Sequence, residues 1–316
     1  MFLPRLVPGP LVRFFARPYV AGWSLDDALR TVADRYTHQG VTSTLDLLGE
    51  DVVRRDQVEA QVRTYRAMID RAANDPRFEG GPRPTVSLKP SGFTCGAREE
   101  AEEHIIALAE RAHAAGVGLT VDMEDRRWTD LTLDWAISLF HRGFDVGTVL
   151  QTRLHRTERD VGRIPPGMRI RLVIGIYPEP KEVALTDKAA MKERLLAYAE
   201  RLLAAGARVE FATHDEGVLH RFATEVAPMA PERCEVQLLL GVPRLGMQVA
   251  LQNGELGPRI PVRLYVPFAT SKHDATAYLR RRMAESPSIL WLVLRNLVDQ
   301  RPKRLPAPAQ ERSISP

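Results

Sequence analysis

Short apolar runs alternate with longer amphipathic segments over most of the chain. Each run is rich in Val, Ile, Leu or Thr, and most runs end in polar residues or glycine, a pattern that predicts β-strands. Between the runs, apolar residues recur at the spacing of one helix face. The predicted strands are residues 41–50, 85–92, 117–125, 145–152, 169–177, 208–215, 234–241 and 263–270.

Two of the intervening segments show the helical pattern clearly. Residues 98–116 carry an apolar stripe and close on Gly116, and glycine is the residue that most often ends a helix. Residues 186–206 repeat this pattern and end on Gly206. A capping box from Thr186 to Ala189 would start the second helix, although it is imperfect because residue 189 is not glutamate.

Strands that alternate with helices predict parallel βαβ units. Eight such units fit a (β/α)8 TIM-type barrel of the α/β class, which usually takes roughly 250 residues. A doubly wound sheet is the alternative, but no GxGxxG loop follows the first strand, where the sequence reads LDLLGEDVV. We therefore predict an N-terminal helical arm at 1–40, a barrel domain at 41–299 and a disordered, Pro-rich tail at 300–316.

Polar side chains stand at the carboxyl ends of the predicted strands. In a barrel these ends form the face that carries the active site. Each residue alone is explained as an ordinary strand end, whereas the whole set favours a polar ligand with several functional groups. The set is Asp46, Glu50, Lys89, Asp122, Glu124, Gln151, Arg171, Tyr177, Thr213, His214, Gln237 and Tyr265.

Three arginines stand side by side in YLRRRMAES, residues 278–286. At roughly 100° per residue, one face of a predicted helix carries Tyr278, Arg281, Arg282 and Glu285, while Arg280 points almost the opposite way. Two guanidinium groups on one face suit a carboxylate ligand. Charge alone favours the other interpretation, a solvated face on which Arg281 and Glu285 form an i,i+4 ion pair.

Composition narrows the class of protein. The chain of 316 residues has 44 basic and 40 acidic side chains, and it lacks the basic and aromatic pattern of nucleic-acid binding. Two cysteines without metal-type spacing, Cys95 and Cys234, fit a reduced cytoplasmic protein without a metal site.

Arginines and prolines interrupt the apolar N-terminus, which argues against a signal peptide or spanning helix. Two interpretations of the N-terminal segment remain: a helix packed on the barrel, and a peripheral contact with a membrane surface.

Further motifs recur in a fixed order. They are LDLLGE (45–50), VSLKPSG (86–92), VDMED (121–125), LQT (150–152), RLVIGIY (171–177), FATH (211–214), EVQLLLG (235–241) and RLYVPF (263–268), followed by Tyr-x-x-Arg-Arg-x-x-Glu at 278–285. Together they resemble the FAD-dependent proline dehydrogenase family in its short, monofunctional bacterial form. The resemblance covers residues 41 to 290, and it is specific because the motifs keep the family's order and spacing.

The resemblance implies a distorted barrel that holds FAD across the strand ends, with the last helix over the barrel mouth. It implies oxidation of L-proline to Δ1-pyrroline-5-carboxylate by hydride transfer from the ring to FAD, the first step of proline catabolism to glutamate. Members of the family commonly pass the electrons to a membrane quinone, which implies a cytoplasmic protein that can also sit at the inner face of the membrane. The sequence does not define the oligomeric state.

Residue roles also follow from the resemblance. Arg171 would approach flavin N5, where a fixed positive charge stabilises the reduced flavin, and Glu50 would pair with Arg281 as a gate. Tyr265 favours unsubstituted proline over hydroxyproline. The implied catalytic residues are Arg171, Lys89 and Asp122; the implied substrate contacts are Arg281, Arg282, Tyr265, Tyr278, Tyr177, Leu239 and Glu50; and the implied FAD contacts are Gln151, Arg171, Thr213, His214 and Glu285.

One segment departs from the family pattern. The family usually reads Arg-Leu-x-Lys-Gly-Ala-Tyr where this chain reads RLVIGIY, so Ile174 replaces a lysine near the flavin and Ile176 replaces an alanine beside the substrate. We expect these changes to alter flavin affinity or potential and the shape of the pocket. Two alternatives therefore remain open: oxidation of another cyclic secondary amino acid in a biosynthetic pathway, and a non-catalytic ligand-binding barrel.

Overall fold

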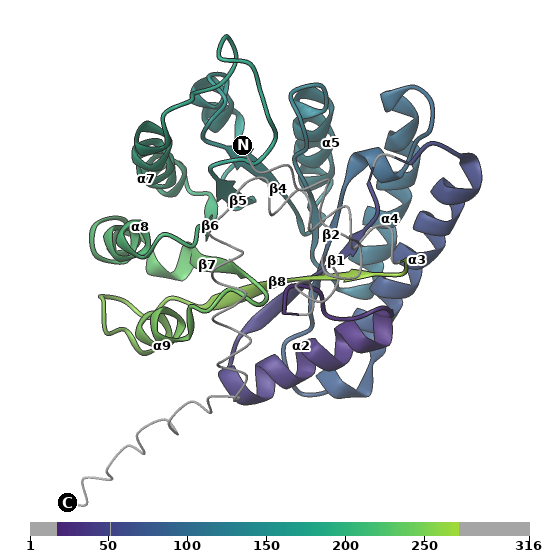
Figure 1. Cartoon of the computed structure of the whole chain (residues 1–316), viewed down its shortest axis with the longest axis horizontal. Helices are drawn as coiled ribbons and strands as arrows, with labels where there is room; N and C mark the ends of the chain where they lie inside the picture. The colour runs from purple at the N-terminus through teal and green to yellow at the C-terminus, as the bar shows by residue number, and fades with distance from the viewer. Residues whose placement is uncertain (1–17, 51, 272–316) are drawn as a thin grey trace, which may run out of the picture.

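The computed structural model describes residues 18–50 and 52–271, in which eight parallel strands close into a barrel (Figure 1). Each strand pairs with its successor, and β8 pairs with β1 in a register that joins Thr42 to Arg263 and Leu48 to Ala269. The closed barrel confirms the predicted fold class and excludes the doubly wound sheet. The strands are β1 (Thr42–Leu48), β2 (Thr85–Leu88), β3 (Leu119–Val121), β4 (Val146–Gln151), β5 (Arg169–Val173), β6 (Arg208–Ala212), β7 (Cys234–Leu239) and β8 (Val262–Ala269).

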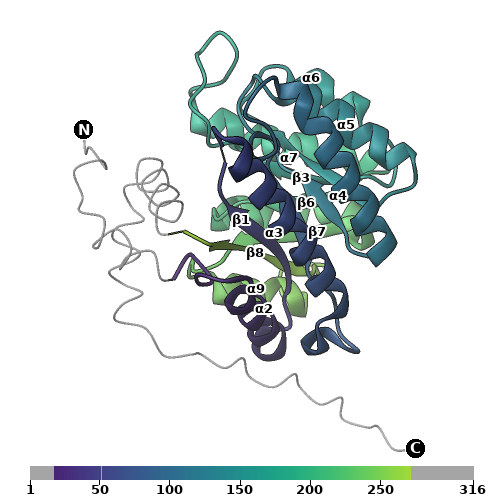
Figure 2. The same ribbon diagram turned by 90° about the vertical axis from the view of Figure 1, so that its right-hand side faces the viewer.

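Helices surround the barrel, as the two perpendicular views show (Figures 1 and 2). The α-helices are α2 (Leu25–Gln39), α3 (Arg55–Asn74), α4 (Ala101–Ala115), α5 (Thr129–His141), α6 (Thr157–Asp160), α7 (Lys188–Ala204), α8 (Glu216–Arg221) and α9 (Leu245–Asn253). Single turns complete the connections: η2 (Pro76–Phe78), η3 (Pro90–Gly92), η4 (Arg98–Glu100), η5 (Val161–Arg163), η6 (Phe222–Val226), η7 (Ala227–Met229) and η8 (Pro231–Arg233).

The eight predicted strands are all present, but most end earlier than predicted. The predicted strand at 117–125, for example, contains only the three paired residues of β3, and Asp122 and Glu124 follow them. The polar residues that lie beyond the hydrogen-bonded strands are Glu50, Lys89, Asp122, Glu124, Tyr177, Thr213 and His214. Those that lie within the strands are Asp46, Gln151, Arg171, Gln237 and Tyr265.

The two helices that the sequence predicted most clearly are α4 and α7. Helix α4 ends at Gly116, which has φ +64° and caps the helix as predicted. The predicted start of α7 was wrong by one residue. The cap is Asp187 rather than Thr186, and its carboxylate accepts hydrogen bonds from the backbone N–H groups of Ala189 (3.0 Å) and Ala190 (3.3 Å). Aspartate satisfies the free N–H groups of a first turn as well as threonine does.

The two faces of the strands differ in chemistry. Along β5, buried Ile170 and Leu172 alternate with Arg169 and Arg171, because successive side chains of a strand point to opposite sides. The apolar residues belong to the core between barrel and helices. Arg169 pairs with Glu210 on the neighbouring strand β6 at 2.8 Å, and Arg171 pairs with Asp122, which follows β3, at 2.6 Å. The interior of the barrel is therefore polar and ionic.

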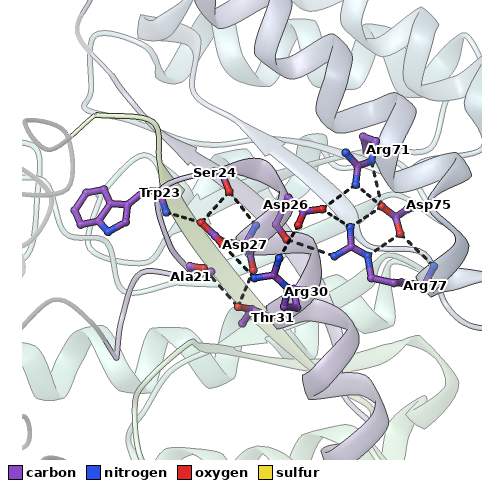
Figure 3. Close-up of polar contacts among 10 residues, drawn as sticks. All are labelled: Ala21, Trp23, Ser24, Asp26, Asp27, Arg30, Thr31, Arg71, Asp75 and Arg77. Atoms are coloured by element: carbon purple, nitrogen blue, oxygen red, sulfur yellow. Dashed lines mark hydrogen bonds and ion pairs between the residues drawn. The ribbon is translucent and has the colours of Figure 1, made fainter.

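A network of charges fastens α2 to the end of α3 (Figure 3). Asp26, in the first turn of α2, accepts hydrogen bonds from Arg71 (3.1 Å) and Arg77 (2.7 Å). Both arginines also bind the buried carboxylate of Asp75, with closest contacts of 2.7 and 2.8 Å. The hydrogen bonds from Arg77, followed by those from Arg71, hold the pKa of Asp75 below its usual range despite its burial. Helix α2 is thereby tied to the barrel at its start.

The predicted domain limits fall largely outside the described residues. Helix α2 lies within the predicted N-terminal arm, whereas the tail at 300–316 is not described. Among residues 18–50 and 52–271, no helix is long and apolar enough to cross a bilayer. Both cysteines are free thiols, Cys95 exposed and Cys234 buried.

Replacing Asp75 tests this network. We expect Asp75→Asn to lower the free energy of unfolding by about 2–4 kcal/mol at pH 7, because two guanidinium groups lose a buried anionic partner. The lowered pKa gives stability that is present above the unfolded value of about 4 and is lost as the pH falls below it. The difference between parent and variant should therefore shrink below about pH 4 in urea unfolding. Asp56→Asn, at the exposed Arg54–Asp56 pair, is the control and should change little. An equal cost for both variants would contradict the account.

Candidate active site

A cavity of about 310 Å3 opens at the carboxyl ends of the strands. Of the residues that the sequence selected, those that line it are Asp46, Lys89, Asp122, Gln151, Arg171, Tyr177, Thr213, His214, Gln237, Leu239 and Tyr265. Glu50 does not line it, and Tyr278, Arg281, Arg282 and Glu285 lie outside the described residues. The cavity thus gathers side chains that are far apart in sequence, such as Lys89 and Tyr265, which are 176 residues apart, as the strand-end rule predicted.

Asp122 lies at the centre of the polar contacts in this cavity. Its Oδ1 accepts a hydrogen bond from Arg171 Nη1 at 2.6 Å, and its Oδ2 accepts one from the Tyr265 hydroxyl at 2.6 Å. Lys89 Nζ lies 3.7 Å from the same Oδ2. Both oxygens are thus engaged, so Asp122 fixes the positions of one cation and one aromatic ring.

Lys89 has a second acidic partner, Asp46. The sequence analysis listed Asp46 only as a polar strand end and gave it no role. Lys89 Nζ lies 2.5 Å from Asp46 Oδ1, and Asp46 is almost completely buried. Burial opposes the charge on Lys89, but Asp46, Tyr265 and Asp122 together hold its pKa well above the ordinary value. Burial also raises the pKa of Asp46 to about 6, against the attraction of Lys89. At neutral pH the pair is ionised and Lys89 presents a cation to the cavity.

Arg171 is held on two sides. Its Nε donates to Gln237 Oε1 at 2.5 Å, and its Nη1 donates to Asp122 and, at 3.4 Å, to Ser87 Oγ. Its guanidinium carbon lies 4.8 Å from the centroid of the Tyr265 ring. Burial disfavours the charge of Arg171, but Asp122 more than compensates and its pKa is raised. The remaining nitrogen, Nη2, is buried and has no hydrogen-bond partner among the described residues.

Glu124 supports the rim of the cavity without lining it. Its carboxyl oxygens bind the backbone N–H (2.8 Å) and the hydroxyl (2.6 Å) of Ser91, in the turn that follows Lys89. Its backbone carbonyl accepts a hydrogen bond from Gln151 Nε2 at 2.9 Å. Burial raises the pKa of Glu124 to about 7, although the bonds from Ser91 oppose the shift. Gln151 Oε1 is buried and has no hydrogen-bond partner among the residues described.

The segment that departs from the family pattern forms one wall of the cavity. Ile174 is partly buried against the core, whereas Ile176 is 37% exposed, and both line the cavity. Between them, Gly175 has φ +100°, and a Cβ atom there would lie 2.5 Å from Gln151 Oε1 and 2.9 Å from Arg153 Cδ. Glycine is therefore required both for the backbone conformation and for space. Arg153 Nη1 fastens the same loop through the carbonyl of Tyr177 at 2.5 Å.

The Thr213–His214 pair follows β6 and lies beside the end of β7. His214 Nε2 accepts a hydrogen bond from the backbone N–H of Leu239 at 3.3 Å. Because a backbone N–H can only donate, Nε2 carries the lone pair and a neutral ring has its proton on Nδ1. Thr213 Oγ1 accepts from the backbone N–H of Asp215 at 3.2 Å. These bonds orient both side chains at the cavity.

Sequence reasoning missed the residues that support the predicted ones. Asp46 and Gln237 were noted only as polar strand ends, yet they contact Lys89 and Arg171 directly. Glu235, which accepts a hydrogen bond from Gln237 Nε2 at 3.0 Å, was not selected at all. The two-residue spacing of Glu235 and Gln237 on β7 was the available signal, because it places both side chains on one face of the strand.

Comparison with known proteins agrees with this architecture. The family model of proline dehydrogenase matches residues 28–290. The proline dehydrogenase of Deinococcus radiodurans is 31% identical over 90% of this chain and 90% of its own length, and proline dehydrogenase 1 of Bacillus subtilis strain 168 is 28% identical over 90% and 91%.

Solved structures show the same fold. Proline utilization A from Bdellovibrio bacteriovorus, inactivated by N-propargylglycine, superposes on 86% of this chain with a TM-score of 0.75 and 22% identity. Proline utilization A with proline bound in remote sites superposes on 88% with a TM-score of 0.69 and 24% identity. This chain spans about a third of each of those proteins, 32% and 31%.

The buried carboxyl of Glu124 makes stability depend on pH. Its raised pKa gives stability that is present below the unfolded value of about 4.5 and is lost as the pH rises through about 7. Glu124→Gln imitates the protonated acid and keeps both bonds to Ser91. We expect the variant to match the parent near pH 4 and to be more stable by roughly 3 kcal/mol at pH 8, as measured by urea unfolding. The exposed Glu99→Gln serves as control. A variant less stable than the parent at pH 8 would show that the fold favours the ionised carboxylate and would contradict the raised pKa of Glu124.

Proposed function

The chain belongs to the proline dehydrogenase family, and we propose that it oxidises L-proline to Δ1-pyrroline-5-carboxylate with FAD as its cofactor, the first step of proline catabolism to glutamate. The observation that carries the proposal is the family match across the barrel, combined with a cavity at the strand ends lined by Lys89, Asp122, Arg171 and Tyr265. The family is flavin-dependent. Electron transfer to a membrane quinone, with the protein in the cytoplasm or at the inner face of the membrane, is part of the same proposal.

The cavity suits a flavin. A flavin ring carries both hydrogen-bond donors and acceptors, and the cavity residues offer both: Arg171 Nη2 is a buried donor and Gln151 Oε1 a buried acceptor without protein partners in the described part of the chain. Buried polar atoms of this kind are costly unless a ligand or water satisfies them. Gly175 keeps the space beside Gln151 open. We propose that Arg171, Gln151, Thr213 and His214 hold the flavin, together with Glu285 from the undescribed segment.

The flavin, when bound, accepts the hydride that leaves the proline ring. The chain's own residues bind and orient the substrate. Oxidation removes a hydride from the ring carbon and a proton from the ring nitrogen, so the carboxylate of proline takes no part in bond changes and serves as a handle. Lys89 and Asp122 form the polar side of the substrate pocket, while Tyr265, Tyr177 and Leu239 provide walls against which the ring packs. Such positioning removes orientational entropy before reaction.

Charge balance explains why the arginine pair is needed. The described cavity holds the anions of Asp46 and Asp122 against the cations of Lys89 and Arg171. A substrate carboxylate would therefore enter without a compensating charge, which is unfavourable in a site screened from water. We propose that Arg281 and Arg282 supply this charge, that Tyr278 packs on the substrate, and that Glu50 pairs with Arg281 when the site closes.

Anaerobic titration of the flavin-loaded protein tests the function. We expect L-proline to bleach the oxidised flavin absorption and to yield Δ1-pyrroline-5-carboxylate, trapped with an aromatic amino-aldehyde. Hydroxyproline should reduce the flavin more slowly, because Tyr265 occupies the space near the ring. A flavin that is reduced only by another cyclic secondary amino acid would move the assignment to that substrate. A protein that takes up no flavin would contradict both enzymatic assignments.

The arginine run offers an internal control. We expect Arg281→Ala and Arg282→Ala to raise the KM for proline by roughly thirtyfold or more, since each removes a charged hydrogen-bond donor from a carboxylate. Arg280→Ala should leave KM nearly unchanged, because the helical spacing turns residue 280 away from that face. Steady-state kinetics on the three variants make the comparison, and equal effects would contradict the shared-face interpretation.

A further inference from the structure

We propose that Gln237 is a positioning residue for Arg171, and that Glu235 and Arg263 hold the Gln237 amide in its working orientation. The inference rests on the proposed function, since it concerns the arginine that we assign to the flavin. Gln237 and Arg171 are buried, 4% and 5% exposed.

The first link is the contact between Gln237 and Arg171. Arg171 Nε donates to Gln237 Oε1 at 2.5 Å, while Asp122 and Ser87 take Nη1 on the other side of the guanidinium. Contacts on opposite sides of a planar group prevent it from rotating or sliding. The nitrogen that is left without a partner among the described residues, Nη2, therefore has one fixed direction.

The second link fixes the amide itself. A glutamine side chain can present either its oxygen or its nitrogen, and only the oxygen can accept from Arg171. Gln237 Nε2 donates to Glu235 Oε1 at 3.0 Å, and this carboxylate cannot accept from an amide oxygen. Arg263 Nε holds the same Oε1 at 2.7 Å. Arg263 is anchored in turn by the backbone carbonyl of Ser43 at 3.0 Å. These successive contacts, from Arg263 through Glu235 to Gln237, determine that the oxygen of the Gln237 amide faces Arg171.

The strands explain why these residues meet. Glu235 and Gln237 stand two residues apart on β7 and so share its inner face, and the register of β7 with β8 joins Gln237 to Arg263. Arg171 reaches them from β5 across the intervening strand β6. Rigid strands place such contacts more precisely than loops do.

The chemistry explains why residue 237 is an amide. A carboxylate at this position would also bind Arg171, but it would neutralise the cation further and would face the like charge of Glu235. An amide fixes the guanidinium and leaves its positive charge available toward the cavity. Asp122 is then the one carboxylate, among the described residues, that is hydrogen-bonded to Arg171. A cation held in this way favours a reduced, anionic flavin more than a mobile or neutralised one.

Three variants separate these effects. Gln237→Leu removes the acceptor, Gln237→Glu adds a charge, and the double variant Gln237→Glu/Glu235→Gln keeps the net charge but moves the carboxylate next to Arg171. We expect all three to lower the midpoint potential of the bound flavin, and to lower kcat roughly tenfold or more with a smaller change in KM for proline, because a hydrogen bond to a charged group contributes about one tenfold step. Gln248→Leu, a buried glutamine on α9, should leave both unchanged.

A second readout does not depend on the flavin. With nitrogen-labelled arginine, the Nε–H resonance of Arg171 is identified by its loss in Arg171→Lys. It should exchange slowly with water in the parent and in Gln248→Leu, and faster in Gln237→Leu. If Gln237→Leu does not fold, Gln237→Met, which also removes the acceptor and keeps the length of the side chain, takes its place in the exchange measurement.

The outcomes are distinguishable. An unchanged Nε–H exchange rate in the variant without the acceptor would overturn the positioning role. An unchanged flavin potential in the double variant would overturn the claim that residue 237 has to be an amide. A parent protein that binds no flavin would overturn the proposed function, while the exchange measurement would still test whether Gln237 holds Arg171.

Discussion

Charges buried inside the barrel must be paired, and this requirement organises the rest of the structure. A charge without a partner in such surroundings costs several kcal/mol, so each carboxylate has to lie beside a cation with good geometry. The pairs connect neighbouring or next-but-one strands of the ring that are well separated in sequence, and they leave little freedom in how the strands are placed. They are Asp46–Lys89, Asp122–Arg171, Glu210–Arg169 and Glu235–Arg263.

This pairing links the barrel to its chemistry. Asp46–Lys89 and Asp122–Arg171 line the cavity, whereas the other two pairs do not. Glu235–Arg263 is linked to Arg171 through Gln237. A paired interior adds little stability compared with an apolar one, but it fixes directions. The cavity therefore presents Lys89 and Arg171 as oriented cations. The glycine at position 175 serves the same site by leaving room that any side chain would fill.

Sequence patterns were sufficient for the barrel and for much of the cavity, because both depend on local periodicity. The alternation of apolar runs and helices defined eight strands, and the strand-end rule then selected Lys89, Asp122 and Arg171. The pairings could not be predicted in this way. Asp122 and Arg171 are 49 residues apart, and only the closed ring and its register bring them together. The cap of α7 was misplaced for a simpler reason: Thr186 and Asp187 are both good caps, and side-chain geometry chooses between them.

The account depends most on the Asp122–Arg171 pair, and a double-mutant cycle measures it directly. Asp122→Asn, Arg171→Met and the double variant would be compared by their free energies of unfolding in urea at pH 7. Each single variant leaves one buried charge without its partner, whereas the double variant leaves none. The account predicts a coupling energy of about 2 kcal/mol or more. Costs that add to within about 0.5 kcal/mol would show that the two residues do not depend on each other, and would contradict the claim that buried ion pairing sets the geometry of the site.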